Sequence, residues 1–346
     1  MNASPLILAA AFCAAAHTSP AGAADAKPLR FEHRDWELVC DNTRTCRAAG
    51  YHPEAQEDAP VSVLLERRAG PGQAIVAKVR LGDDENAAAP AALAMAIDGR
   101  SLGSIALSGG ESIGALSPAQ TEALVRAVAD SGRIEWRAGR RHWALSGAGA
   151  AAVLLKMDEF QGRLGTMGAA IRKGPKADAA ALPALAAPNV VAAAVPQGAL
   201  PPPGKDEQRL LLASLRKTVT GDECELLADA ASGKNPLAYV PLSADRMLVS
   251  TVCWRAAYNE GSGYWVASRK PPFAVAYVTQ MGTGYDKGSI SASQRGRGVG
   301  DCGSIGEWVW DGRRFVQTLE ATTGMCRGIA AGGAWTLPTL VSKVKR

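Results

Sequence analysis

Seven cysteines are the feature of this sequence that most constrains its fold. The first, Cys13, lies in an uncharged apolar run from Leu6 to Ala16, and the small residues Ala21-Gly22-Ala23 follow that run. This pattern is typical of a signal peptide that is cleaved on export, so we expect residues 1–23 to be removed and Cys13 with them. The run is shorter than the ~20 apolar residues that span a bilayer, and we expect no transmembrane segment in the mature form.

The cysteines that remain are an even set in a chain bound for an oxidising compartment, so we expect all of them to be paired. Several connectivities are possible. Because the cysteines follow one another as neighbours in sequence, we predict the pairs Cys40 with Cys46, Cys224 with Cys253, and Cys302 with Cys326. Zinc is the alternative, but the sequence has no Cys-x-x-Cys, and its mature histidines lie far from most of the cysteines. We therefore predict no metal and no cofactor.

Length and composition predict two globular domains with an α+β fold. A chain of 346 residues with 47% hydrophobic and 21% charged residues is neither disordered nor a multi-span membrane protein. Residues 174–205 are rich in Ala and Pro and include three consecutive prolines, so we interpret them as an extended linker. We predict an N-terminal α+β domain at 24–173 and a β-rich, disulfide-containing domain at 206–346, both with antiparallel sheets.

The N-terminal domain is expected to begin with hairpins. Cys40 and Cys46 flank a polar turn at 41–44 and should pin the first hairpin. Short runs with β-branched residues at 61–67 and 74–81 flank the turn sequence Ala-Gly-Pro-Gly, and they predict a second hairpin.

Two helices are also predicted in this domain. Ser117-Pro118-Ala119-Gln120 forms a capping box with proline in the first turn, so a helix should begin there. A second helix is expected at about 149–161. Between them, 134–136 and 142–145 predict another hairpin.

The C-terminal domain is expected to open with a short helix at 207–217 and then to become β-rich. Trp308-Val309-Trp310-Asp311-Gly312-Arg313 is its clearest hairpin, because Asp-Gly favours the turn whose twist matches paired strands. Further short strands are predicted at 246–254, 264–267, 273–279, 289–294 and 313–319.

The net charge of +5 is modest and falls in short basic groups. We interpret these groups as solvated surface, with anionic lipid headgroups or acidic envelope polymers as the alternative partners. Nucleic acid is not expected as a partner of an exported protein. The groups are Arg67-Arg68, residues 137–141, Arg295 with Arg297, and residues 343–346.

Aromatic residues are concentrated in the C-terminal domain and give the best candidate for a binding surface. Large amphipathic rings can line a groove for glycans or peptides, although filling a sheet core is the simpler explanation of most of them. The predicted surface consists of Trp254, Tyr258, Asn259, Tyr264 and Trp265, with Arg295 and Arg297 nearby.

No coherent catalytic set is found in the sequence. Gly110-Glu111-Ser112-Ile113-Gly114 matches the nucleophile elbow of hydrolases, but no helix is expected directly behind the serine. The enzymatic alternative is a hydrolase of an envelope polymer that uses two carboxylates among Asp301, Glu307 and Asp311, which would have to lie about 5 to 9 Å apart.

Three segments of the sequence carry a resemblance to a known family. The first, 35–51, runs from Asp35-Trp36-Glu37 through both cysteines to Gly50-Tyr51. The others are 253–259, Cys253-Trp254-Arg255-Ala256-Ala257-Tyr258-Asn259, and 300–312, which contains Gly300-Asp301-Cys302-Gly303 and Trp308-Val309-Trp310-Asp311-Gly312. Together they resemble the domain of unknown function 1176 family of exported Gram-negative proteins. The first domain is more loosely similar to the invasion-associated locus B family. The resemblance implies periplasmic residence and a β-rich fold, and it brings no catalytic residues. We therefore expect a non-enzymatic protein that binds another envelope protein or an anionic envelope polymer, with the oligomeric state left open.

Overall fold

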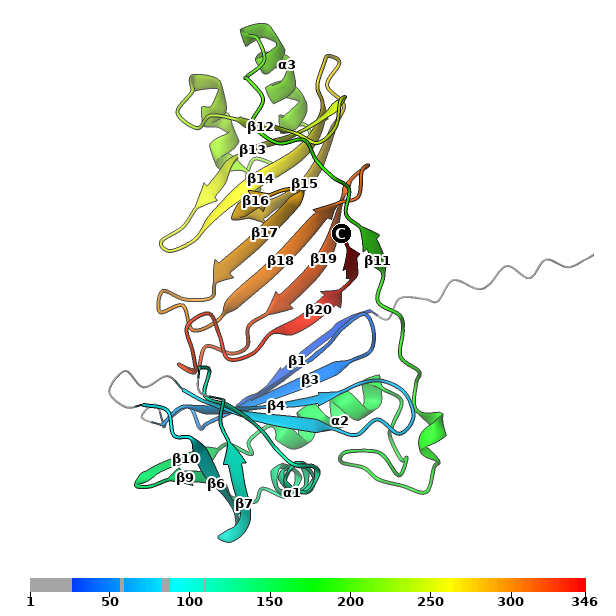
Figure 1. The fold of residues 1–346 in the computed structure, drawn as a ribbon, viewed down its shortest axis with the longest axis vertical. Helices are drawn as coiled ribbons and strands as arrows, with labels where there is room; N and C mark the ends of the chain where they lie inside the picture. The colour runs from blue at the N-terminus through cyan, green and yellow to red at the C-terminus, as the bar shows by residue number, and fades with distance from the viewer. Residues whose placement is uncertain (1–26, 57–58, 83–87, 109) are drawn as a thin grey trace, which may run out of the picture.

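The structure is a computed structural model that describes residues 27–56, 59–82, 88–108 and 110–346, so the expected signal peptide lies outside the described residues. Its antiparallel sheets lie one after another along the long axis of the molecule (Figure 1). The predicted α+β class with antiparallel sheets is confirmed. None of the described helices is long and apolar enough to cross a membrane.

The N-terminal half, residues 27–173, contains two antiparallel sheets. The larger has the order β1 (Leu29–His33), β2 (Trp36–Cys40), β3 (Cys46–Tyr51), β4 (Val61–Arg67), β5 (Val76–Leu81) and β8 (Ile113–Ala115). The smaller has the order β10 (Arg141–Leu145), β9 (Ile134–Ala138), β6 (Ala92–Ile97) and β7 (Arg100–Ala106). The hairpins predicted at 40–46, 61–81 and 134–145 are confirmed by the pairing of β2 with β3, β4 with β5, and β9 with β10.

Both predicted helices of this half are confirmed. In α1 (Pro118–Ala129), the Ser117 hydroxyl accepts a hydrogen bond from the Gln120 amide at 3.2 Å, and the Gln120 side chain accepts one from the Ser117 amide at 2.8 Å. α2 (Ala150–Phe160) begins after Gly149, whose φ is +97°. A Cβ at this glycine would lie 1.9 Å from the His33 carbonyl oxygen, so only glycine allows the helix to approach β1 so closely.

The C-terminal half, residues 205–346, begins with helix α3 and contains two more antiparallel sheets. α3 (Lys205–Arg216) and the 3-10 segment η2 (Glu225–Ser232) pack beside the first sheet. That sheet has the order β12 (Ala238–Pro241), β13 (Arg246–Arg255), β14 (Glu260–Ser268) and β15 (Val275–Gly282). The second has the order β16 (Gly284–Asp286), β17 (Ser289–Arg295), β18 (Gly303–Trp310), β19 (Phe315–Thr322) and β20 (Leu337–Val341).

All three predicted disulfides are confirmed. Cys40–Cys46 closes the β2–β3 hairpin, Cys224–Cys253 joins the segment before η2 to β13, and Cys302–Cys326 joins the segments that flank β18 and β19. Each bond links segments that are also close in sequence, so the disulfides fix local structure within each half.

The Ala- and Pro-rich segment runs from the N-terminal half along the side of the C-terminal half (Figure 1). It contains the short segment η1 (Asp178–Ala180) and strand β11 (Asn189–Val191), which pairs in parallel with β21 (Lys343–Lys345). Further along, the Ala193 amide donates to the Trp310 carbonyl at 2.9 Å and the Leu200 amide to the Tyr239 carbonyl at 2.9 Å. The segment is therefore anchored at several points, and its role as a boundary between separately folding domains stays a prediction.

Each half has its own apolar core, and a further buried cluster joins the two. This junction cluster contains Val39, Ala49 and Tyr51 from β2 and β3, and Ile329, Ala334, Trp335 and Leu337 from the segment that leads into β20. The Trp335 ring N–H donates to the Ser62 hydroxyl at 2.7 Å, and this bond is buried. The face of the larger N-terminal sheet that α1 and α2 leave open is therefore covered by the C-terminal half.

The buried carboxylate of Asp41 organises the turn between β2 and β3. It accepts hydrogen bonds from the Thr43 amide at 2.8 Å, the Thr45 amide at 3.2 Å and the Arg47 guanidinium at 2.9 Å. Arg47 in turn pairs with Glu66 at 2.8 Å. The turn is therefore rigid without any contact from the other half.

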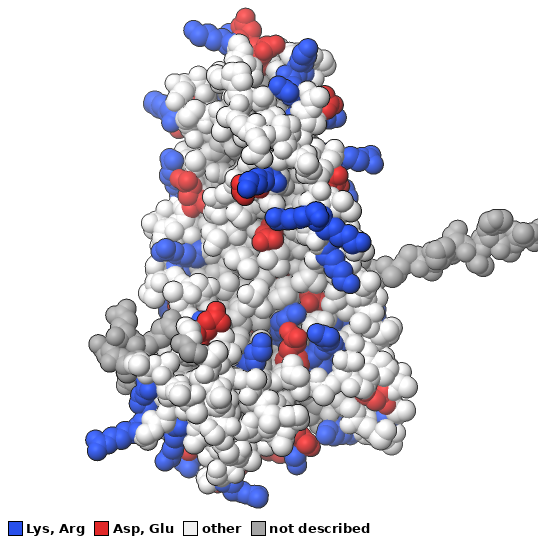
Figure 2. All heavy atoms as spheres, in the orientation of Figure 1, with Lys and Arg blue, Asp and Glu red and all other residues white. Residues whose placement is uncertain are grey.

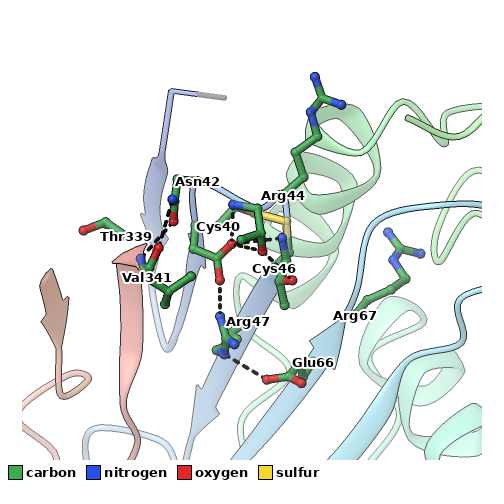
Figure 3. Close-up of polar contacts among 12 residues, drawn as sticks. Cys40, Asn42, Arg44, Cys46, Arg47, Glu66, Arg67, Thr339 and Val341 are labelled. Atoms are coloured by element: carbon green, nitrogen blue, oxygen red, sulfur yellow. Dashed lines mark hydrogen bonds and ion pairs between the residues drawn. A yellow bond between two sulfur atoms is a disulfide. The ribbon is translucent and has the colours of Figure 1, made fainter. Parts of the chain in front are cut away.

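This rigid turn presents Asn42 to the edge of β20. The Asn42 side chain donates to the Val341 carbonyl at 3.1 Å and accepts from the Val341 amide at 2.9 Å, and the Asn42 amide donates to the Thr339 carbonyl at 3.1 Å (Figure 3). One amide side chain thus satisfies both backbone groups of an edge residue, as a neighbouring strand would.

Asn42→Ala should lower the free energy of unfolding by about 1 to 3 kcal/mol, because it leaves the amide and carbonyl of Val341 without their partner. Urea unfolding of the oxidised mature chain measures this change. Asn189→Ala is the matched control, since Asn189 is exposed in β11 and its side chain makes no hydrogen bond within the described residues. An equal loss in both variants, or none in either, would contradict the role given to Asn42.

Candidate functional site

The structure separates the residues that sequence reasoning grouped into one binding surface. Trp265 is fully buried in the core beneath α3, and its ring N–H donates to the Thr218 hydroxyl at 2.9 Å. Tyr264, its neighbour in β14, is 6% exposed and packs into a different cluster on the opposite face of the strand. Trp254 is partly buried and donates to the Gln280 carbonyl at 3.1 Å. These three rings belong to the framework of the domain.

The remaining members come together at two adjacent loops. The β13–β14 turn carries Tyr258 and Asn259, Arg295 ends β17, and Arg297 lies in the loop between β17 and β18; both loops lie at the left edge of Figure 1. The second loop also carries Val299, which sequence analysis did not single out. Tyr258 is 46% exposed and Val299 78% exposed. We call these five residues the loop platform.

Asn259 joins the two loops of the platform. Its side chain donates to the Arg295 carbonyl at 2.8 Å and accepts from the Arg295 amide at 2.8 Å. The Tyr258 ring lies beside Gly298, where an added Cβ would come within 3.6 Å of the ring. The exposed Tyr258 and Val299 side chains therefore sit on loops whose positions are already fixed.

Asp301 fixes the base of the second loop. Both of its carboxylate oxygens accept from Arg297, at 2.7 and 2.6 Å, and the Gly328 amide donates to it at 2.6 Å. The Arg297 hydrogen bonds hold the pKa of the Asp301 carboxyl below its usual value, against the opposing effect of burial. Asp301 is therefore a structural anion, committed to its arginine.

The three acids of the hydrolase hypothesis lie far apart along one strand. Asp301 precedes β18, Glu307 lies exposed within it, and Asp311 follows it, where its carboxylate accepts from the Arg313 and Arg314 amides at 2.8 Å. At ~3.3 Å per residue, Glu307 and Asp311 are roughly 13 Å apart along the chain. This spacing exceeds the separation that paired catalytic carboxylates need.

One group among the described residues has the spacing of a metal site. Asp301, Cys302 and Cys326 place their ligand atoms within 4.8 Å of one another. The two sulfurs are joined to each other in a disulfide, so neither is available as a thiolate ligand. The chemistry of this donor set does not fit a metal ion.

The basic groups expected on the surface are mostly exposed, with one correction. Lys and Arg side chains are spread over the visible face with acidic residues between them (Figure 2). Arg67, in contrast, is 1% exposed and pairs with the fully buried Asp158. The alternation Val61, Val63, Leu65 along β4 places Arg67 on the inward face, and that periodicity could have identified it as a buried cation.

Sequence analysis also missed Glu37, a buried carboxylate at the junction between the halves. Glu37, 3% exposed in β2, accepts from the Tyr51 hydroxyl at 2.5 Å and from the Met325 amide at 2.7 Å. Burial raises the pKa of Glu37, and burial together with the nearby Glu37 carboxylate raises the pKa of Tyr51 well above its usual value. Arg327, a cation at the junction, is paired with Asp35 at 2.8 Å.

Comparison with known proteins gives a family and one relative. A family model described as "Protein of unknown function (DUF1176)" matches residues 30–342, which confirms the resemblance to that family. The chain is similar to the Uncharacterized protein YpfG of Escherichia coli (strain K12), with 28% identity over 345 residues that cover 91% of this chain and 93% of the relative. No solved structure matches the chain. The looser likeness to the invasion-associated locus B family stays a prediction.

Glu37→Gln should make stability less dependent on pH. Because burial raises the pKa of Glu37 above 4.5, the native state holds its proton through a pH window in which the unfolded chain has lost it, so stability falls as the pH rises through that window. Glutamine keeps the acceptor oxygen and removes the charge. The variant should therefore be the more stable protein above the window, by about 1.4 kcal/mol for each pH unit between the two pKa values.

Urea unfolding from about pH 4 to about pH 8, a range that begins near the ordinary carboxyl pKa and extends above it, measures this effect. Glu307→Gln serves as the control, because Glu307 is exposed and makes no ion pair within the described residues. A native chain whose stability rises steadily with pH, in parallel with Glu37→Gln, would refute the assignment.

Proposed function

The chain belongs to the family of proteins of unknown function DUF1176, and from that premise we propose that it is an exported, periplasmic binding protein. The loop platform is its contact surface, and its partner is an acidic segment of another envelope protein. Export is supported by the apolar run at residues 6–16 and by three disulfides, which persist in oxidising compartments.

The observation that carries the proposal is the exposure of Tyr258 and Val299 on loops that are held in place. An exposed aromatic ring and an aliphatic side chain supply the apolar contact area at the centre of many protein interfaces. Asn259, the Arg297–Asp301 pair and the Cys302–Cys326 disulfide fix the backbone beneath them. A partner would then bind without first ordering the loops, which reduces the entropic cost of association.

The charge of the loop platform favours an acidic partner. The Arg295 guanidinium lies along Gly300, where an added Cβ would be 3.5 Å from its Nε, and makes no ion pair within the described residues. Arg297 is about half exposed although it is paired with Asp301. A carboxylate on the partner could therefore pair with Arg295 beside the Tyr258 ring, and such complementarity contributes chiefly to specificity and association rate.

Removing either kind of contact should weaken binding. Tyr258→Ala removes the aromatic anchor and should raise the Kd of the partner complex about thirtyfold, the effect of ~2 kcal/mol at an interface hot spot. Arg295→Glu should slow association and weaken or reverse its dependence on salt, because the substitution replaces an attraction by a repulsion. Affinity capture from a periplasmic extract with the oxidised mature chain as bait, followed by crosslinking and titration of the captured protein, gives both measurements.

Val76→Ala is the matched control bait, because Val76 is 57% exposed and lies in the N-terminal half, away from the loop platform. The proposal predicts that the control retains the partner, that the crosslinks fall at Tyr258 and Arg295, and that the crosslinked peptide is acidic. Retention of the same protein by both platform variants would refute the proposal. Capture of a polysaccharide in place of a protein would assign the surface to an anionic polymer.

A further inference from the structure

The N-terminal half contains a cleft of about 440 Å³, remote in the chain from the loop platform. One wall is α1, through Pro118 and Val125; a second is the turn that precedes β5, through Ile75; and a third is the loop that follows α2, through Ala170 and Lys173. This volume lies within the ~300 to 1,000 Å³ of typical small-molecule sites.

Arg67 is one of the residues that line this cleft, and its side chain is only 1% exposed. Its Nη2 donates to Asp158 at 2.5 Å, its Nε to the Gln161 side chain at 2.7 Å, and its Nη1 to the Gly168 carbonyl at 3.3 Å. In Figure 3 the Arg67 side chain points away from Arg47 and Glu66. Arginine has five N–H donors, and these bonds use three, so donors remain for a ligand.

A buried ion pair of this kind is not explained by stability alone. Replacing a buried pair with apolar residues of similar size is often neutral or stabilising, because the desolvation of two charges offsets their attraction. Burial lowers the pKa of Arg67 although Asp158 favours its charged form. An additional anion near Arg67 would be attracted by a cation that the protein has already desolvated and oriented.

The walls of the cleft are fixed by a second arginine. Arg163 is fully buried, and it donates to Asp178 at 2.7 Å and to the Gly70 carbonyl. Asp178 also accepts from the Gly72 amide at 2.5 Å, which joins the loop after α2 to the turn before β5. The cleft is therefore formed before any ligand arrives, as a specific binding site requires.

Charge and apolar surface are arranged within the cleft in a way that selects a class of ligand. Arg126 at the rim is paired with Glu122, whereas Lys173 makes no ion pair within the described residues. Ile75 and Val125 provide apolar wall. The two lining carboxylates, Glu122 and Asp178, are paired with Arg126 and Arg163. The site thus offers two further cationic groups, Arg67 and Lys173, beside an apolar surface.

We propose that this cleft binds a small amphipathic anion, a molecule that carries one carboxylate or phosphate group on an apolar body. The anionic group pairs with Lys173 and the free donors of Arg67. The apolar body packs against Ile75, Val125 and Pro118. Nothing in this proposal depends on the partner of the loop platform, because the cleft is lined by the N-terminal half and by Asp178 of the Ala- and Pro-rich segment, and no residue of the loop platform lines it.

Three probes of equal chain length test the ligand class: decanoate, decyl phosphate and decanol. Isothermal titration of the oxidised mature chain should show saturable binding of at least one of the two anions. Decanol should bind about tenfold more weakly or not at all, since it keeps the apolar contact but lacks the charged hydrogen bonds. Tighter binding of decanoate or of decyl phosphate identifies which anionic group the site accepts.

Variants locate the site. Lys173→Met keeps the apolar stem and should weaken anion binding by up to about fivefold, the upper end of the range for an exposed charge pair. Ile75→Trp fills the cleft and should abolish binding. Lys176→Met is the matched control, because Lys176 is an exposed lysine on the same loop that does not line the cleft. Circular dichroism confirms that each variant is folded.

The proposal fails if neither anion binds, or if decanol binds as tightly as both anions, which would make the site purely apolar. It also fails if folded Lys173→Met and Ile75→Trp bind as the unmodified chain does, which would place the anion elsewhere. Equal weakening by Lys176→Met would show a general charge effect and would likewise overturn it.

Discussion

The buried junction between the two halves is the interaction on which the rest of the structure depends. α1 and α2 cover one face of the larger N-terminal sheet, and the other face is closed by the chain from Thr323 to Leu337. Trp335 packs in this apolar cluster, and hydrogen bonds accepted by Ser62, Glu37 and Asn42 also cross the junction. Because an antiparallel sheet with two apolar faces needs cover on both, the N-terminal sheet is complete only when the C-terminal half is docked. The Ala- and Pro-rich segment, anchored along that half, keeps the two parts of the junction close together.

The features predicted well from sequence are those that local chemistry determines. Cysteines that are neighbours in sequence did pair, since each disulfide closes a short loop. The capping box at Ser117 fixed the start of α1, because its bonds span only three residues. Strands β6 and β7 contain one β-branched residue each and were not predicted, because β6 is held by pairing with both β7 and β9 and not by its own propensity.

The burial and the partners of side chains that depend on tertiary contacts could not be predicted from the sequence in this way. Trp265 and Tyr264 adjoin in β14, and strand alternation sends their rings into two different cores, which removes both from the predicted surface. The alternation along β4 indicates that Arg67 faces inward, but its partners Asp158 and Gln161, some ninety residues later, are found only in the folded structure. Glu37 has an apolar neighbour on each side in sequence, yet only the arrival of Met325 from the C-terminal half shows that its carboxylate is enclosed. In each case the deciding partner is distant in the chain.

The junction joins the two halves, whose other apolar clusters are separate, into one cooperative structure. Differential scanning calorimetry of the oxidised mature chain tests this most directly. A single transition, in which the calorimetric and van't Hoff enthalpies agree, is the predicted result. Two resolved transitions, one for each half, would show that the halves unfold independently and would contradict the claim.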